Sequence, residues 1–92
     1  MDDHRREVLR PKPDVICRRV GDTAVLVDLT TNQIFELNRT GHRIWELLGQ
    51  GLDRQAIADC LQQEFSVDRN QLEREMDDLL HALTTEQLIA EQ

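Results

Sequence analysis

The sequence predicts a small α+β domain in which a three-stranded antiparallel meander precedes three helices. Within the first 40 residues, short segments of β-branched and apolar residues are separated by small polar turn residues, a pattern typical of hairpins. Beyond them, apolar residues recur every three or four positions behind polar capping residues, which is typical of amphipathic helices. A chain of 92 residues has room for one core of this kind.

The predicted strands cover residues 14–20, 23–29 and 33–37. A Gly-Asp pair forms the first turn and a run of small polar residues forms the second. Links this short make neighbouring strands antiparallel. Because only helices follow, the third strand has no neighbour from the chain on its outer side. Its outer backbone N–H and C=O groups are therefore predicted to stay available to another peptide.

Each predicted helix begins at a polar capping residue. Asn38 or Thr40 caps the first helix, Asp53 the second and Asp68 the third. The apolar stripe of each helix is expected to face the core. These stripes are Ile44, Leu47 and Leu48 in the first helix, Ile57, Cys60, Leu61 and Phe65 in the second, and Leu72, Met76, Leu79, Leu80 and Leu83 in the third.

The two ends of the chain are less regular. The first 13 residues are charged, weakly patterned and end with Pro11 and Pro13, which predicts a flexible N-terminal arm over residues 1–13 and one folded domain over residues 14–92. Near the other end, Leu88 and Ile89 are expected to pack as a last turn or as a short extended tail.

The composition is acidic and limits the classes of partner. The chain has 11 Lys and Arg against 18 Asp and Glu, and a formal net charge of −7. Such a body repels phosphate, so nucleic acid is not an expected partner. No apolar run approaches the roughly 18 residues that cross a bilayer, and the N-terminus lacks the apolar region of a signal peptide. We therefore expect a cytoplasmic protein without a membrane partner.

No catalytic or metal-binding constellation is evident in the sequence. The two cysteines, Cys17 and Cys60, lack metal-ligand spacing and are expected to be reduced thiols, and the three histidines are scattered. His42 forms a helical i,i+4 pair with Glu46, which indicates a surface contact. No phosphate-binding loop or nucleophile elbow is present. The sequence predicts a protein that is not an enzyme and needs no cofactor or metal.

Acidic residues gather on the third predicted helix, and two interpretations are open. They form a solvated face partly balanced by Arg69–Glu73 and Arg74–Asp78 pairs, or they attract a basic peptide toward the neighbouring strand edge. The cluster consists of Glu73, Glu75, Asp77 and Asp78.

The run GDTAVLVDLTTNQIFELNRTGHRIWELLGQG is followed by LDRQAIADCLQQEF and VDRNQLEREMDDLLHALTTEQLI. From about residue 11 to residue 89 this order resembles the PqqD-like family of peptide-recognition domains. The resemblance is carried by the strand VLVD, the Leu-Asn pair after the third strand, the IWELL helix with its trailing glycine, and a last helix that ends in LL..L. The resemblance implies a winged-helix-like fold. It also implies a role as the recognition element (RRE) for ribosomally synthesised, modified peptides (RiPPs), in which the domain binds the leader of a precursor peptide.

By this resemblance the leader adds as a fourth strand to residues 33–37 and packs side chains into a cleft against the last helix. The segment QIFELNRTGHRIWELL is closest to the stand-alone proteins of lasso-peptide pathways, which present the precursor to a separate leader peptidase. The alternatives are a PqqD-type peptide chaperone for a radical-SAM enzyme, a winged-helix transcription regulator, and a homodimer that pairs its own edge strands. The predicted peptide-binding residues are Gln33, Ile34, Phe35, Glu36, Leu37, Glu73, Met76, Asp77 and Leu80.

Overall fold

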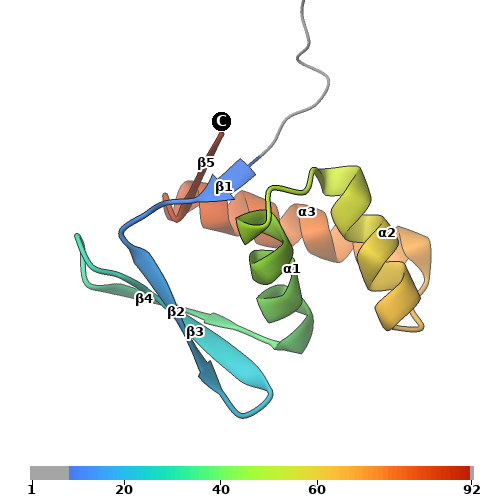
Figure 1. The fold of residues 1–92 in the computed structure, drawn as a ribbon, viewed down its shortest axis with the longest axis horizontal. Helices are drawn as coiled ribbons and strands as arrows, with labels where there is room; N and C mark the ends of the chain where they lie inside the picture. The colour runs from blue at the N-terminus through green and yellow to red at the C-terminus, as the bar shows by residue number, and fades with distance from the viewer. Residues whose placement is uncertain (1–8, 92) are drawn as a thin grey trace, which may run out of the picture.

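A computed structural model of the chain describes residues 9–91. Figure 1 shows a three-stranded sheet at one end of the molecule and α2 at the other, with α1 and α3 between them. The architecture is α+β, as predicted. The elements in chain order are β1 (Leu9–Pro11), β2 (Val15–Val20), β3 (Thr23–Asp28), β4 (Gln33–Leu37), α1 (Arg39–Gly49), α2 (Arg54–Glu64), α3 (Arg69–Thr85) and β5 (Ile89–Glu91).

The main sheet is an antiparallel meander in the order β2-β3-β4, which confirms the predicted topology. Gly21 lies in the first turn at φ 63°, a left-handed conformation that glycine adopts without strain. In the second turn, the buried carboxylate of Asp28 accepts hydrogen bonds from the backbone N–H of Thr30 at 2.9 Å and of Thr31 at 3.3 Å. These local bonds hold the turn that positions β4 at the edge of the sheet.

A second, two-stranded sheet pairs β1 with β5 antiparallel, and the sequence did not predict it. The expected arm over residues 1–13 overlaps β1, and residues 1–8 lie outside the described residues. Neither strand has a local sequence pattern that predicts it, because each is three residues long and its partner lies at the other end of the chain. Leu88 and Ile89 were expected to form either a last helical turn or a short extended tail. They form the extended tail, and both are buried.

All three helices begin where the capping residues predicted. The side chain of Asn38 accepts a hydrogen bond from the N–H of Gly41 at 2.8 Å, so Asn38 rather than Thr40 caps α1. Asp53 caps α2 and Asp68 caps α3 in the same way, with hydrogen bonds of 2.9 Å and 3.1 Å. Each cap satisfies an N–H group that the helix itself leaves without a partner.

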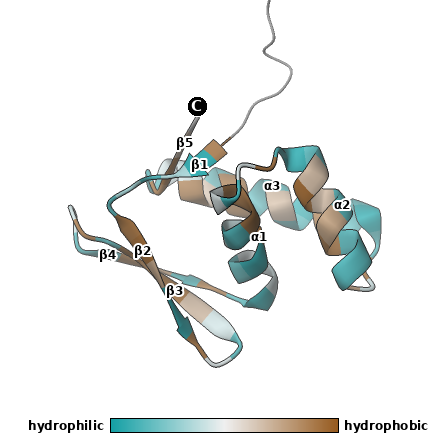
Figure 2. Cartoon of the chain, in the orientation of Figure 1, coloured by the Kyte–Doolittle hydropathy of each residue, from teal (hydrophilic) through white to brown (hydrophobic). Residues whose placement is uncertain are grey.

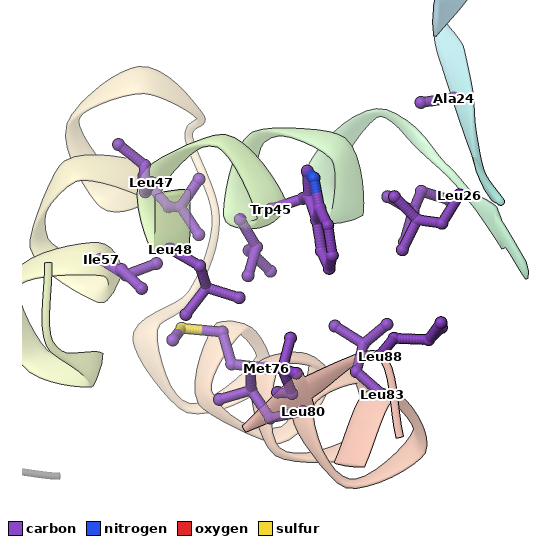
Figure 3. Close-up of a cluster of buried hydrophobic side chains, with 14 of the residues drawn as sticks. Ala24, Leu26, Trp45, Leu47, Leu48, Ile57, Met76, Leu80, Leu83 and Leu88 are labelled. Carbon is purple, nitrogen blue, oxygen red and sulfur yellow. The ribbon is translucent and has the colours of Figure 1, made fainter. Parts of the chain in front are cut away.

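The core lies where α1 packs between the sheet, α3 and the β1–β5 pair. Figure 3 shows Leu26 of β3 approaching Trp45 of α1, and Met76 and Leu80 pointing from α3 toward α1. Figure 2 shows hydrophobic and hydrophilic residues alternating along the helices, as amphipathic elements require. None of the helices in the described part of the chain is long and apolar enough to cross a membrane. The fully buried large side chains are Leu26, Ile44, Leu47, Leu48, Ile57, Leu61, Leu72, Met76, Leu83 and Leu88.

Candidate functional site

The hydrogen-bonding phase of the sheet determines which backbone groups of β4 point outward. A two-residue turn joins β2 to β3, so the flanking residues Val20 and Thr23 form a hydrogen-bonded pair. The N–H of Leu29 donates to the carbonyl of Asp14 at 2.9 Å, which continues the same alternation. Hydrogen-bonded and non-hydrogen-bonded pairs alternate along antiparallel strands. The odd-numbered residues of β3 therefore direct their backbone N–H and C=O groups toward β2, and the even-numbered residues direct theirs toward β4.

This alternation leaves two residues of β4 whose backbone N–H and C=O groups point away from the sheet. The even-numbered residues of β3 pair with Gln33, Phe35 and Leu37, which are therefore the residues that hydrogen-bond to β3. Ile34 and Glu36 direct their N–H and C=O groups to the outer edge. Within residues 9–91, no strand pairs with that edge. β4 therefore offers two donors and two acceptors in the spacing that an added strand needs.

A hollow of about 330 Å³ lies beside this edge, between β4, the first turns of α1, and α3. Its volume is at the low end of the range for ligand pockets, so it fits one or two side chains of a peptide. Apolar groups from all three elements face it, and carboxylates of α3 stand at its side. The lining residues are Phe35, Glu36, Leu37, Asn38, Thr40, Gly41, Ile44, Glu75, Asp78 and Leu79.

One contact links the start of β4 to α3, and a second links α1, just after the end of β4, to α3. At the start of the strand, the side-chain amide of Gln33 donates a hydrogen bond to the carboxylate of Glu86, the C-cap residue of α3. At the other end, a Cβ placed on Gly41 would lie 3.5 Å from Leu79 and 3.2 Å from the capping oxygen of Asn38. A side chain here would therefore crowd the Asn38 cap and meet Leu79 at an ordinary contact distance, so α1 lies directly against α3 at this point. The start of β4 thus lies beside the end of α3, and the first turn of α1, which follows β4, lies beside Leu79 of α3.

The predicted site residues on β4 and on α3 lie in different surroundings. Phe35, Glu36 and Leu37 line the hollow, and Ile34 is 66% exposed beside it. Gln33 forms the contact with Glu86 that closes one end of the strand. Three of the five predicted strand residues therefore line the hollow, and their role in peptide binding stays a prediction.

On α3 the structure does not bring the four predicted residues into the hollow. Met76 is 0% exposed and Leu80 is 5% exposed, and both belong to the core that faces α1. Asp77 pairs with Arg54 of α2. Glu73 pairs within α3 with Arg69 at 2.8 Å, and Arg69 also pairs with Asp59 of α2, so both carboxylates lie on the side of α3 toward α2.

The residues of α3 that do line the hollow are Glu75, Asp78 and Leu79. The sequence placed Leu79 in the core stripe, beside Leu80. Because adjacent apolar residues lie about 100° apart on a helix, the pattern alone does not show which of the two faces the core. Only the packing of α3 against α1 determines that Leu80 faces the core and Leu79 faces the hollow.

The carboxylates of the hollow differ from most other acidic groups of the helices in having no cationic partner. The predicted Arg69–Glu73 pair is present, but Arg74 forms no ion pair with Asp78 within the described residues. Glu75 accepts a hydrogen bond from Gln71 at 3.2 Å and has no ion pair there either. These two charges are therefore left to solvent or to a ligand.

The remaining polar groups form pairs that hold helices together. Arg43 of α1 donates two hydrogen bonds of 2.8 Å to Glu64 of α2, and these bonds lower the pKa of the Glu64 carboxyl. His42 lies 3.7 Å from Glu46, as its spacing predicted. Burial raises the pKa of the Cys17 thiol. Among residues 9–91 no group of three potential metal ligands comes together.

The chain is similar to one known family and to two solved structures. Residues 23–89 match the family described as Coenzyme PQQ synthesis protein D (PqqD). The solved structure of TbiB1 in complex with the TbiA(beta) leader peptide is 36% identical, with a TM-score of 0.79 over 87% of this chain and 93% of that chain. Lasso peptide synthetase B1 complexed with the leader peptide shares the fold, at 24% identity and a TM-score of 0.79 over 90% of this chain and 98% of that chain.

Among curated proteins, none matches the chain. The family match spans most of the sequence, from the start of β3 to the start of β5. The resemblance noted in the sequence is thereby confirmed, and this chain belongs to the PqqD family.

Proposed function

We propose that this protein binds the leader of a precursor peptide as an added strand on the outer edge of β4, without catalysing a reaction itself. The observation that carries the proposal is the pair of residues Ile34 and Glu36, whose backbone groups point outward beside a partly apolar hollow. Strand addition uses such an edge for affinity and adjacent pockets for side-chain specificity. The 36% identical TbiB1, solved with a leader peptide, supports the same role here.

The geometry assigns alternate leader side chains to two sides of the extended sheet. Side chains directly opposite one another on paired strands lie on the same face. Leader residues opposite Phe35 and Leu37 therefore point into the hollow, and those opposite Ile34 and Glu36 point to the outer face. The edge of β4 and the hollow beside it together form a groove. Every second leader residue is thus expected to contact this groove, in either strand direction.

Neither the edge nor the hollow suffices alone. Four backbone hydrogen bonds net about 4 kcal/mol, because each replaces a bond to water. Two buried apolar anchors add about 1.5–3 kcal/mol each, while ordering a flexible leader costs about 2–5 kcal/mol. A micromolar complex corresponds to about 8 kcal/mol. The backbone pairing then fixes the register, and the anchors supply most of the discrimination between peptides.

We further propose that the bound precursor is presented to a separate leader peptidase, as in a lasso-peptide pathway. The similarity to TbiB1 favours this setting. Delivery to a radical-SAM enzyme is the alternative, and it would use the same edge and hollow. The test is the rate at which a lasso-pathway leader peptidase cleaves its precursor with and without this protein. Faster cleavage supports presentation, and an unchanged rate contradicts it.

Leader binding is tested by fluorescence polarisation with a labelled TbiA(beta) leader peptide. We expect saturable binding with a Kd in the micromolar range. The control is a peptide of the same composition in scrambled order, which keeps the charge but loses the spacing of the anchors. Equal affinity for both peptides, or no saturable binding of the leader, would contradict the proposal. Light scattering of the free protein shows whether two copies pair through β4 instead.

A further inference from the structure

The α3 side of the hollow is acidic in a way that the rest of the helical surface is not. Glu75 and Asp78 line the hollow next to Leu79 and have no ion pair within residues 9–91. On the other side of the same helix, Glu73 and Asp77 are both paired with arginines. Arg74 lies next to the unpaired carboxylates on the surface but forms no hydrogen bond or ion pair with them in the described part of the chain.

This arrangement combines an apolar floor with unpaired negative charge at one location. Phe35 and Leu79, both half-buried, contribute the accessible apolar surface of the hollow, and the two α3 carboxylates stand on its α3 side. A ligand with only apolar side chains leaves both charges without a partner as it excludes water around them, which is unfavourable. A long basic side chain avoids this penalty, because its methylene stem covers apolar surface while its charged end stays near solvent and the carboxylates.

We infer that the groove selects a leader segment in which a lysine or arginine lies two positions from the apolar anchor. The inference rests on the proposed strand addition, which directs every second leader side chain into the groove. One of these side chains fills the hollow over Leu79, and the next one along the same face brings a cation to Glu75 and Asp78. The partner is thus a basic-apolar peptide segment.

The expected effect on affinity is modest and local. A solvent-exposed ion pair contributes about 0.2–1 kcal/mol, which corresponds to about a 1.4- to 5-fold change in Kd for each contact. The association rate responds more strongly than the dissociation rate, because complementary charge steers the encounter. Both effects shrink at about 1 M salt, where the screening length falls to roughly 3 Å.

The helix itself offers a matched control. The double variant Glu75→Gln/Asp78→Asn removes the two charges that α3 contributes to the hollow, whereas Glu73→Gln/Asp77→Asn removes two charges from the side of α3 toward α2. Both variants change the net charge equally, so an effect of overall charge appears in both. Circular dichroism on heating checks that each variant remains folded, since the pairs lost in the control are solvent-exposed and contribute little.

The experiment is a selection from a displayed library of random dodecapeptides on the wild-type protein and on both double variants. Wild type is expected to enrich an apolar residue with lysine or arginine two positions away. The groove variant should keep the apolar preference and lose the basic one, and the control variant should keep both. Enrichment without a basic residue, or an equal loss in both variants, overturns the inference.

Failure of the proposed function gives a different result in the same experiment. Selected peptides are tested against Ile34→Pro, which blocks the strand edge, and Ile34→Ala, which keeps it. Peptides that bind Ile34→Ala but not Ile34→Pro use the edge, whatever their charge. If the selected peptides bind both variants equally, strand addition is wrong, and the basic-apolar inference falls with it.

Discussion

Replacing Ile34 with proline removes one of the two outward N–H donors of β4 and leaves the hydrogen bonds to β3 in place. An edge strand tolerates proline at a position whose N–H faces solvent. The free protein should therefore stay folded. In the complex, the leader carbonyl that would accept from Ile34 is left without a donor beside a proline ring.

The magnitude follows from the lost hydrogen bond and the orphaned carbonyl. One backbone hydrogen bond nets about 0.5–1.5 kcal/mol, and an unsatisfied buried acceptor adds about 1–3 kcal/mol. The two terms add to about 1.5–4.5 kcal/mol, and the midpoint of about 3 kcal/mol corresponds to a Kd that is about 160-fold weaker. With a micromolar wild type, binding of the labelled TbiA(beta) leader should be barely detectable by fluorescence polarisation.

Two further variants separate the backbone effect from its alternatives. Ile34→Ala loses the same side chain and keeps the N–H, so its affinity should stay close to wild type. Phe35→Pro removes a donor of the β3–β4 ladder, so it should lower the stability of the free protein. If Ile34→Pro bound the leader as well as Ile34→Ala, or unfolded like Phe35→Pro, the deduced phase of the sheet would be wrong.

Three other predictions concern single side chains. Leu79→Asp should weaken leader binding at least about tenfold in a folded protein, whereas Met76→Asp buries an unpaired charge and should unfold the domain; polarisation and urea unfolding distinguish them, and equal stability of the two would refute the assignment. Glu64→Gln should reduce the free energy of unfolding by about 0.2–1 kcal/mol near neutral pH. Because the hydrogen bonds from Arg43 lower the folded pKa of Glu64, this contribution is fully present above the ordinary pKa of 4.5 and is lost as the pH falls through the lowered folded pKa. Urea titrations across that range measure the loss, and a difference that does not shrink as the pH falls below 4.5 would contradict it. The raised pKa of Cys17 leaves little thiolate, so in a Cys60→Ser variant iodoacetamide at about pH 8 should react with it more slowly than with free cysteine; an equal or faster rate would argue against burial.

Local signals in the sequence were sufficient for most of the fold. Asp53 and Asp68 predicted the starts of two helices because a capping side chain acts within three residues of itself. The short turns predicted the meander for a similar reason. β1 and β5 were missed because each gains its hydrogen bonds only from the other, and their pairing joins opposite ends of the chain.

The candidate site was predictable on the strand and not on the helix. A strand has a period of two, so one exposed edge fixes the roles of Ile34 and Phe35 together. On α3, the apolar stripe is wide enough to allow several rotations of the helix, and the choice between Leu79 and Leu80 as the groove residue depends on tertiary packing. The shift from Glu73 and Asp77 to neighbouring carboxylates has the same origin.

Amide hydrogen exchange, followed by NMR on the isotope-labelled protein with and without the TbiA(beta) leader, tests strand addition at individual N–H groups. In the free protein the amide of Phe35 should already exchange slowly, because it is bonded to β3, while those of Ile34 and Glu36 exchange fast. At saturating leader, the amides of Ile34 and Glu36 should become protected together. If the leader binds and both amides still exchange at their free rates, the leader does not pair with β4.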